Sequence, residues 1–99
     1  MLLIIGTVRL PEEKLEAARP AMAAIIAASS EEPGCLEYTY AVDVIDRGLI
    51  HVKERWTDRE ALHTHFRSDH VAQWRAQWPA LGIGERKLFL YEAGEPQLI

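Results

Sequence analysis

Apolar positions divide the first third of the chain into a strand and a helix. Residues 2–9 are apolar and rich in branched side chains, which is typical of a strand. From about residue 12 to residue 30, apolar and small side chains recur at helical spacing, which predicts a helix packed closely on a sheet. Pro20 removes one helix hydrogen bond, so we expect a bend there rather than two helices. Glu32-Pro33-Gly34 predicts the end of the helix and a turn.

The next two apolar segments alternate with period two and predict a β-hairpin. Residues 35–44 and 49–56 form its strands, and Asp46-Arg47-Gly48 forms its turn. In a strand, every second side chain lies on the same face. One such face of the first strand carries Leu36, Tyr38, Tyr40 and Val42, and one face of the second carries Ile50, Val52, Glu54 and Trp56.

Two helix starts follow the hairpin. Thr57 and Glu60 have the spacing of a capping box, which predicts a short helix from about residue 58 to residue 66. Ser68 predicts a second N-cap, followed by a helix whose apolar stripe contains Val71, Trp74 and Trp78. We expect Pro79 and the Gly82–Gly84 segment to end that helix. Residues 87–91 then predict a last strand, and residues 92–99 an extended tail.

This order of elements predicts one α+β domain spanning residues 1–99, with a ferredoxin-like βαββαβ arrangement. Such an antiparallel sheet carries helices on one face and leaves the other open, and an open face should be polar. Both faces of the first and last strands are apolar, so we expect a second copy of the chain to cover the open face as a homodimer, unless the tail covers part of it. The candidate open-face sets are Leu3, Ile5, Phe89 and Tyr91 or their opposite-face neighbours Leu2, Ile4, Leu88 and Leu90.

Charge and composition restrict the partners. The 11 Lys and Arg residues against 15 Asp and Glu residues give a net charge of -4, which disfavours binding to nucleic acid. The longest strongly apolar run, residues 21–28, is shorter than the roughly 20 residues that span a membrane, and no basic segment begins a secretory signal. One cysteine excludes an intrachain disulfide. We therefore expect a soluble cytoplasmic protein.

Four segments together resemble the antibiotic biosynthesis monooxygenase family. They are Glu32–Tyr38 (EPGCLEY), Glu54–Trp56 (ERW), Asp58–Leu62 (DREAL) and His65–His70 (HFRSDH). The resemblance covers residues 2–92. It implies a dimeric α+β barrel in which each subunit holds a pocket between its sheet and its helices. For the oxygenases of this family it also implies that the reaction needs no metal, flavin or other cofactor.

In such an oxygenase the substrate supplies the electrons. Removing a proton from a phenol, quinol or anthrone gives an anion that can pass an electron to O₂. The protein must then provide a base, a dry aromatic slot and donors to the developing oxyanion. Histidine suits the role of base because its ordinary pKa is about 6.5.

The resemblance makes His65 the first candidate for proton transfer, because it occupies the family's histidine position. The alternative is that His65 only caps its helix or bonds a backbone carbonyl. His70 matches a second frequent histidine of the family, in the first turn of the next helix, and is either a base or a surface residue. His63 and His65 lie about 200° apart on a helix and cannot chelate a metal together. No histidine and carboxylate group has metal-ligand spacing along the chain, so we expect no metal site.

Aromatic side chains are the candidates for the walls of a substrate slot. Tyr40 and Trp74 join Tyr38 and Trp56, which stand at positions that match the family, and the Tyr38 hydroxyl is suited to donate to a substrate oxygen. Each of these aromatics is alternatively plain core. Glu54 alternates in phase with Trp56, which predicts an inward carboxyl that either forms a salt bridge or has a raised pKa.

The sequence leaves three hypotheses for the function once the haem-degrading branch of the family is excluded. Haem-degrading relatives use Asn, Trp and His where this chain has Val8 or a neighbour, His65, and Trp74 or Arg75, so haem degradation is not expected. We expect a cofactor-independent monooxygenase that acts on a small aromatic substrate with O₂. A non-oxygenase ligand-binding or isomerase protein is the second hypothesis. A purely structural dimer, whose pocket is filled by its own aromatics, is the third.

Overall fold

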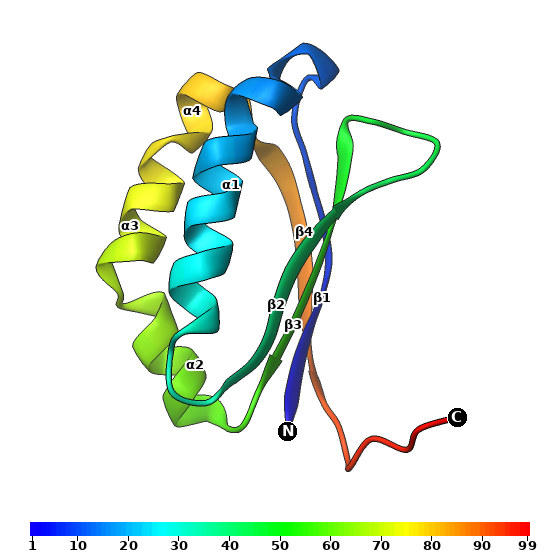
Figure 1. Cartoon of the computed structure of the whole chain (residues 1–99), viewed down its shortest axis with the longest axis vertical. Helices are drawn as coiled ribbons and strands as arrows, with labels where there is room; N and C mark the ends of the chain where they lie inside the picture. The colour runs from blue at the N-terminus through cyan, green and yellow to red at the C-terminus, as the bar shows by residue number, and fades with distance from the viewer.

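A computed structural model describes residues 1–99 and shows helices packed on one side of an antiparallel sheet (Figure 1). The sheet has the order β2-β3-β1-β4, which is the ferredoxin-like arrangement that the sequence predicts. In chain order, the elements are β1 (Leu2–Arg9), the 3₁₀ helix η1 (Glu12–Lys14), α1 (Leu15–Ser30), β2 (Cys35–Val42), β3 (Leu49–Trp56), α2 (Arg59–Phe66), α3 (Asp69–Ala76), α4 (Trp78–Leu81) and β4 (Gly84–Glu92).

The long helix α1 runs without interruption through Pro20, so it is one helix rather than two. Its buried side chains recur every three or four residues, which places them on a single stripe facing the sheet. They are Leu15, Ala18, Met22, Ile25 and Ser29. Because Ala18 and Ser29 are small and completely buried, the helix backbone approaches the sheet closely.

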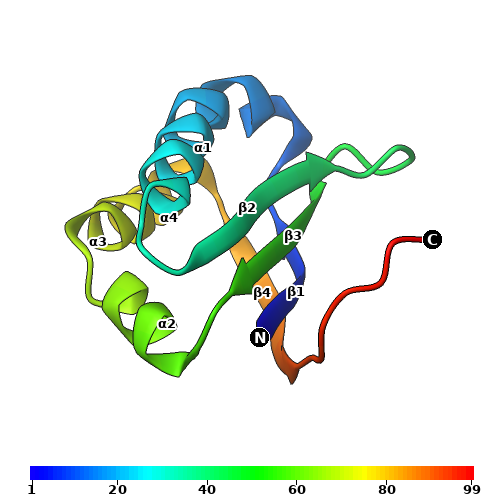
Figure 2. The same ribbon diagram turned by 60° about the horizontal axis from the view of Figure 1, so that its bottom comes forward.

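The two faces of the sheet differ in what covers them. On the helix side, Leu2 and Ile4 of β1 and Ile50 of β3 are buried in the core. Figure 2 shows no helix on the opposite side. There, Ile5, Phe89 and Tyr91 keep 44%, 59% and 50% of their surface exposed. The open face is therefore the one that carries Leu3, Ile5, Phe89 and Tyr91.

The C-terminal tail does not close that face. It leaves the sheet after β4 and extends away from it (Figures 1 and 2). Its last two residues, Leu98 and Ile99, are fully exposed. None of the helices has the length and apolar character needed to cross a membrane.

The structure corrects the predicted face of Leu36. The pairing of β2 with β3 shifts register between Cys35 and Glu37, so Leu36 is the extra residue of a bulge. Its side chain is 48% exposed, whereas Tyr38 on the regular part of the strand is buried. Simple alternation fails at the first residues of β2 for this reason.

Helix boundaries differ from the prediction at two places. Asp58, rather than Thr57, caps α2: its extended backbone precedes the helix and its carboxylate accepts from the Ala61 N–H at 2.9 Å. Ser68 caps α3 as predicted, accepting from the Val71 N–H. Pro79 does not end a helix, because it lies in the first turn of α4, where proline is tolerated. Gly82, with φ of 70°, ends α4 in the left-handed conformation that favours glycine.

Candidate functional site

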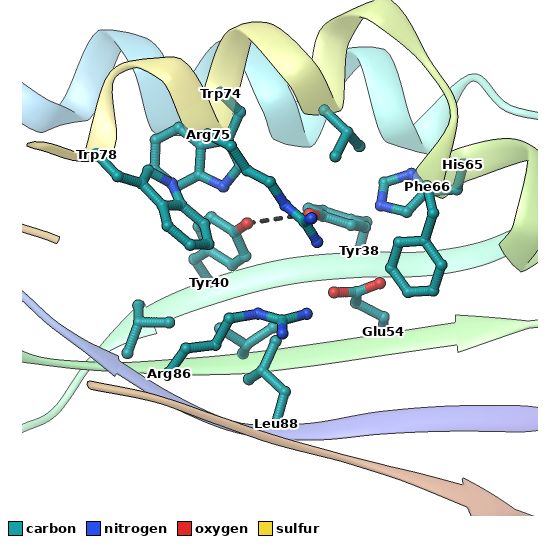
Figure 3. Close-up of a pocket in the computed structure, with 13 residues that line it drawn as sticks. Tyr38, Tyr40, Glu54, His65, Phe66, Trp74, Arg75, Trp78, Arg86 and Leu88 are labelled. Carbon is teal, nitrogen blue, oxygen red and sulfur yellow. Dashed lines mark hydrogen bonds between the residues drawn. The ribbon is translucent and has the colours of Figure 1, made fainter. Parts of the chain in front are cut away.

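A small cavity lies between the helix-covered face of the sheet and the helices α2 and α3. Its volume is about 30 Å³, which has room for about two water molecules. Five of the seven residues that the sequence nominated line it, from β2, β3, α2 and α3 (Figure 3). They are Tyr38, Tyr40, Glu54, His65 and Trp74. Strand alternation placed Tyr38, Tyr40 and Glu54 on this inward face, and His65 and Trp74 reach the cavity from helices. Trp56 and His70 lie outside the lining.

The two tyrosines supply hydroxyl groups to the cavity. Tyr38 and Tyr40 share one face of β2, and their hydroxyl oxygens are 3.0 Å apart in a hydrogen bond. Burial raises the pKa of the Tyr38 hydroxyl, and burial raises the pKa of Tyr40 to about 12. Both phenols therefore stay protonated at neutral pH and can donate to an oxyanion.

Glu54 brings a carboxyl group into the same cavity. It is 4% exposed, and its Oε1 accepts a hydrogen bond from the Trp56 Nε1–H at 3.0 Å. Burial raises the pKa of Glu54 to about 7, although the Trp56 hydrogen bond and the charge of Arg86 oppose the rise. Trp56 itself is completely buried, so it is not a wall of the cavity but holds the Glu54 carboxyl in place.

His65 lies near the end of α2, and its ring faces two aromatic side chains. The ring centroids are 5.4 Å from Tyr38 and 4.7 Å from Trp56. Its Nδ1 lies 2.9 Å from the Glu32 Oε2, and the carboxylate acceptor assigns the proton to Nδ1. Burial lowers the pKa of His65, against the opposing charge of Glu32. A neutral ring with its proton on Nδ1 leaves the Nε2 lone pair free to accept a proton.

Glu32 also lies beside the second histidine, in close contact but without a hydrogen bond. Its Oε1 is 2.7 Å from His70 Nε2, so one carboxylate joins the loop after α1 to the end of α2 and the first turn of α3. The three side chains offer ligand atoms within 4.8 Å of one another, and two imidazoles with a carboxylate are a set that Zn²⁺ accepts. The expectation from sequence spacing missed this group, because Glu32 lies far from both histidines along the chain.

The rim of the cavity contains side chains that the sequence reasoning did not nominate for the pocket. They are Phe66, Arg75, Trp78 and Arg86. The Arg75 Cζ atom is 5.9 Å from the centroid of the Trp78 ring. Arg86 was missed because β4 begins at Gly84, three residues earlier than predicted. Extending the alternation of Leu88 backwards would have placed Arg86 on the inward face.

The arrangement can transfer protons in a place largely shielded from water. A neutral imidazole and a carboxyl whose pKa is near 7 face the same small cavity, and two phenols stand beside them. Groups of this kind can take a proton from a bound ligand and stabilise the anion that results.

Comparisons with known proteins assign the family. The model of the family described as antibiotic biosynthesis monooxygenase matches residues 1–77. A proposed antibiotic biosynthesis monooxygenase from Deinococcus radiodurans is 30% identical, with a TM-score of 0.91 over 100% of this chain and 98% of its own. A conserved protein of unknown function from Bacteroides thetaiotaomicron is 28% identical, with a TM-score of 0.82 over 93% of this chain and 96% of its own.

An uncharacterised protein from Synechocystis is 24% identical to this chain over 98 residues, which are 99% of this chain and 67% of the relative. The resemblance of the four sequence segments is thus confirmed by the match over most of the chain. The protein belongs to the antibiotic biosynthesis monooxygenase family.

Proposed function

We propose that the protein is a cofactor-independent monooxygenase that oxidises a small phenolic, anthrone or quinol-like substrate with O₂. The observation that carries this proposal is the buried, neutral His65 beside two phenols in an aromatic-walled cavity. The family name supports the reaction class, and the residues of the cavity support the way in which it is performed.

In the proposed reaction, His65 Nε2 removes a proton from the substrate hydroxyl. The anion passes one electron to O₂, and the radical pair combines to a hydroperoxide on the ring. Loss of water leaves a new carbonyl, so that the substrate loses two hydrogens, gains one oxygen atom and reduces the second oxygen atom to water. The Tyr38 and Tyr40 hydroxyls donate to the developing oxyanion, while Glu32 keeps the imidazole in the tautomer that accepts a proton.

Binding requires the rim of the cavity to move. A volume of about 30 Å³ is too small for an aromatic ring, so a substrate enters only when rim side chains turn outward. Phe66, Arg75 and Arg86 are exposed, and they form the rim. Their return over the ligand would exclude water from the reacting groups.

We further propose that the active form is a homodimer in the cytoplasm. The open face of the sheet exposes Ile5, Phe89 and Tyr91 together, and a second copy laid over it would bury this apolar surface. The single Cys35 needs no oxidising compartment.

Oxygen uptake tests the proposed reaction. The purified protein is given a panel of quinols, naphthols and anthrones, together with the methyl ether of each hydroxyl compound. We expect oxygen consumption with the hydroxyl compounds, none with the ethers because they have no proton to lose, and the same rate with EDTA present. Absence of uptake above the uncatalysed rate across the panel would contradict the oxygenase function, and loss of activity in EDTA would contradict the absence of a metal.

A second candidate function is an isomerase on the same fold. It is favoured by one observation, the presence of two proton-carrying groups, Glu54 and His65, in one cavity. An isomerase would exchange deuterium into a carbonyl compound without oxygen, whereas the oxygenase would be inactive in anaerobic buffer.

A further inference from the structure

Two arginines without anionic partners face the cavity. Arg75 comes from α3 and Arg86 from β4, and Figure 3 shows their guanidinium groups directed toward the middle of the pocket from opposite sides. Neither takes part in any ion pair of the molecule, although five other arginines do. A guanidinium presents a fixed fork of donors, and an unpaired one beside a cavity is available to a ligand.

The local backbone holds Arg86 in this position. The pairing of β1 with β4 is irregular between Thr7 and Arg9, and Glu85 has φ of 48°, a left-handed conformation that is unfavourable for a residue with a Cβ atom. Glu85 extends to Arg9, with its Oε2 3.5 Å from the Arg9 Nε. The carboxylate next in sequence is therefore turned away from Arg86, which stays unpaired on the cavity side.

The acidic group that lines the cavity, Glu54, offsets these charges only in part. Glu54 forms its hydrogen bond with Trp56, and no ion pair joins it to either arginine. Burial raises the pKa of Glu54 to about 7, so a large fraction of this carboxyl is neutral near neutral pH. The rim of the cavity therefore carries net positive charge, although the net charge of the whole chain is -4.

We propose that Arg75 and Arg86 form a subsite for a carboxylate and that the ligand of this cavity is an aromatic carboxylate. The inference rests on the proposed function in one respect, namely that an aromatic ring occupies the cavity. Two guanidinium forks can grip the planar carboxylate, while Tyr40, Trp74 and Trp78 contact the ring. The two arginines also account for how the ligand enters the cavity. Their side chains turn outward to let it in and then return to contact its carboxylate.

Direct binding of matched small ligands tests this subsite. Benzoate, benzamide and phenol have similar sizes, but only benzoate is an anion at pH 7.5. We expect benzoate to bind about tenfold more tightly than benzamide or phenol in isothermal titration or ligand-observed NMR, a factor typical of a charge-assisted contact. The Arg75→Gln and Arg86→Gln variants should each lose most of this preference, measured within each variant as the ratio of its benzoate and benzamide affinities.

Arg67→Gln is the matched control. Arg67 is also without an ion pair, but it lies at the end of α2 and does not line the cavity, so its removal should leave the preference intact. Equal binding of benzoate and benzamide, tighter binding of phenol, no binding of benzoate, or equal losses in Arg67→Gln would each overturn the subsite.

The outcomes for the subsite and for the reaction are distinct. Arginine-dependent binding of benzoate without oxygen uptake by any hydroxybenzoate or hydroxynaphthoate would support the subsite and contradict the oxygenase. Oxygen uptake that is equally fast with neutral quinols and with their carboxylated analogues would support the oxygenase and overturn the subsite.

Discussion

The two faces of the sheet use the same alternating pattern in opposite ways. On the helix-covered face, apolar side chains surround a few polar groups, and the Glu54 carboxyl is buried with a single tryptophan partner. On the open face, the charges are satisfied among themselves: Glu37 accepts from Lys53 and Arg55 at 2.9 and 2.8 Å. The energetically unfavourable groups on the helix-covered face are therefore buried polar side chains. On the open face they are exposed apolar side chains.

This difference separates the site from the surface for assembly. A polar group buried without full pairing costs free energy, and such groups persist where they have a function. Exposed apolar groups are favourable only when another surface covers them. The first face therefore contains the candidate chemistry, and the second contains the proposed dimer contact.

The largest expected effect comes from a charge on the open face. Ile5→Lys places an ammonium group in the centre of the proposed interface, where burying an unpaired charge is strongly unfavourable. We expect a monomer at micromolar concentration, measured by light scattering after size-exclusion chromatography. Val44→Lys is the control, because Val44 is 99% exposed in the β2–β3 loop. An unchanged dimer in Ile5→Lys, or a wild-type protein that is itself monomeric, would contradict the assignment of this face.

The next effect concerns the helix-covered face. His65→Gln retains a hydrogen-bonding side chain beside Glu32 but cannot accept a proton at neutral pH. We expect the oxygen-uptake rate to fall roughly 100-fold, the range attributed to general base catalysis, with the melting temperature much less affected. His63→Gln changes an exposed histidine of the same helix and should keep full activity. Parallel losses of stability and activity in His65→Gln would indicate a structural role instead.

The alternation of polar and apolar residues along single strands was enough to predict many of the side chains on each face of the sheet. The alternation along β3 identified Glu54 as an inward carboxyl, because one period-two strand with a buried face determines the direction of every side chain. The same rule gave Tyr38 and Tyr40 on β2. It failed at Leu36, because a bulge inserts one residue and breaks the alternation.

Contacts between segments far apart in the chain could not be predicted from the sequence. Glu32 meets His65 only after α1, the hairpin and α2 have packed together, and the sequence separation of 33 residues gives no sign of it. The rim arginines were missed for a related reason. The sequence places Arg75 only at a position that haem-degrading relatives use for a ligand, and Arg86 lies outside the predicted strand. Only the packed structure brings their guanidinium groups to one cavity.

Glu54→Gln should remove part of the pH dependence of the unfolding free energy. Because the pKa of Glu54 is raised to about 7 in the folded protein, the native state holds its proton more tightly than the unfolded chain does. This group therefore stabilises the fold below the ordinary carboxyl pKa, and its contribution is lost as the pH rises to 7. The neutral amide avoids that loss, so the difference in unfolding free energy between variant and wild type should increase by about 3 kcal/mol from pH 4.5 to pH 8.

Urea unfolding at a series of pH values measures this difference. Glu95→Gln in the exposed tail is the control and should show no pH-dependent difference from wild type. A constant difference for Glu54→Gln across the whole range would mean that folding does not raise the pKa of Glu54, so that its carboxyl is ionised near neutral pH and is not a proton carrier there.

The smallest effect is expected from Glu32→Gln, which tests whether this half-buried carboxylate tunes the base. Glu32 raises the pKa of His65 through its charge and its hydrogen bond, in opposition to burial. Removing the charge should lower the pKa of His65 further, and a weaker base should slow proton removal by about tenfold at neutral pH. Titration of the imidazole by NMR gives the pKa, and oxygen uptake gives the rate. Glu31→Gln changes the adjacent carboxylate, which is exposed and forms no ion pair, and should alter neither quantity. If both variants shift the pKa of His65 equally, the effect is one of surface charge, and the hydrogen bond from Nδ1 does not set the basicity of the ring.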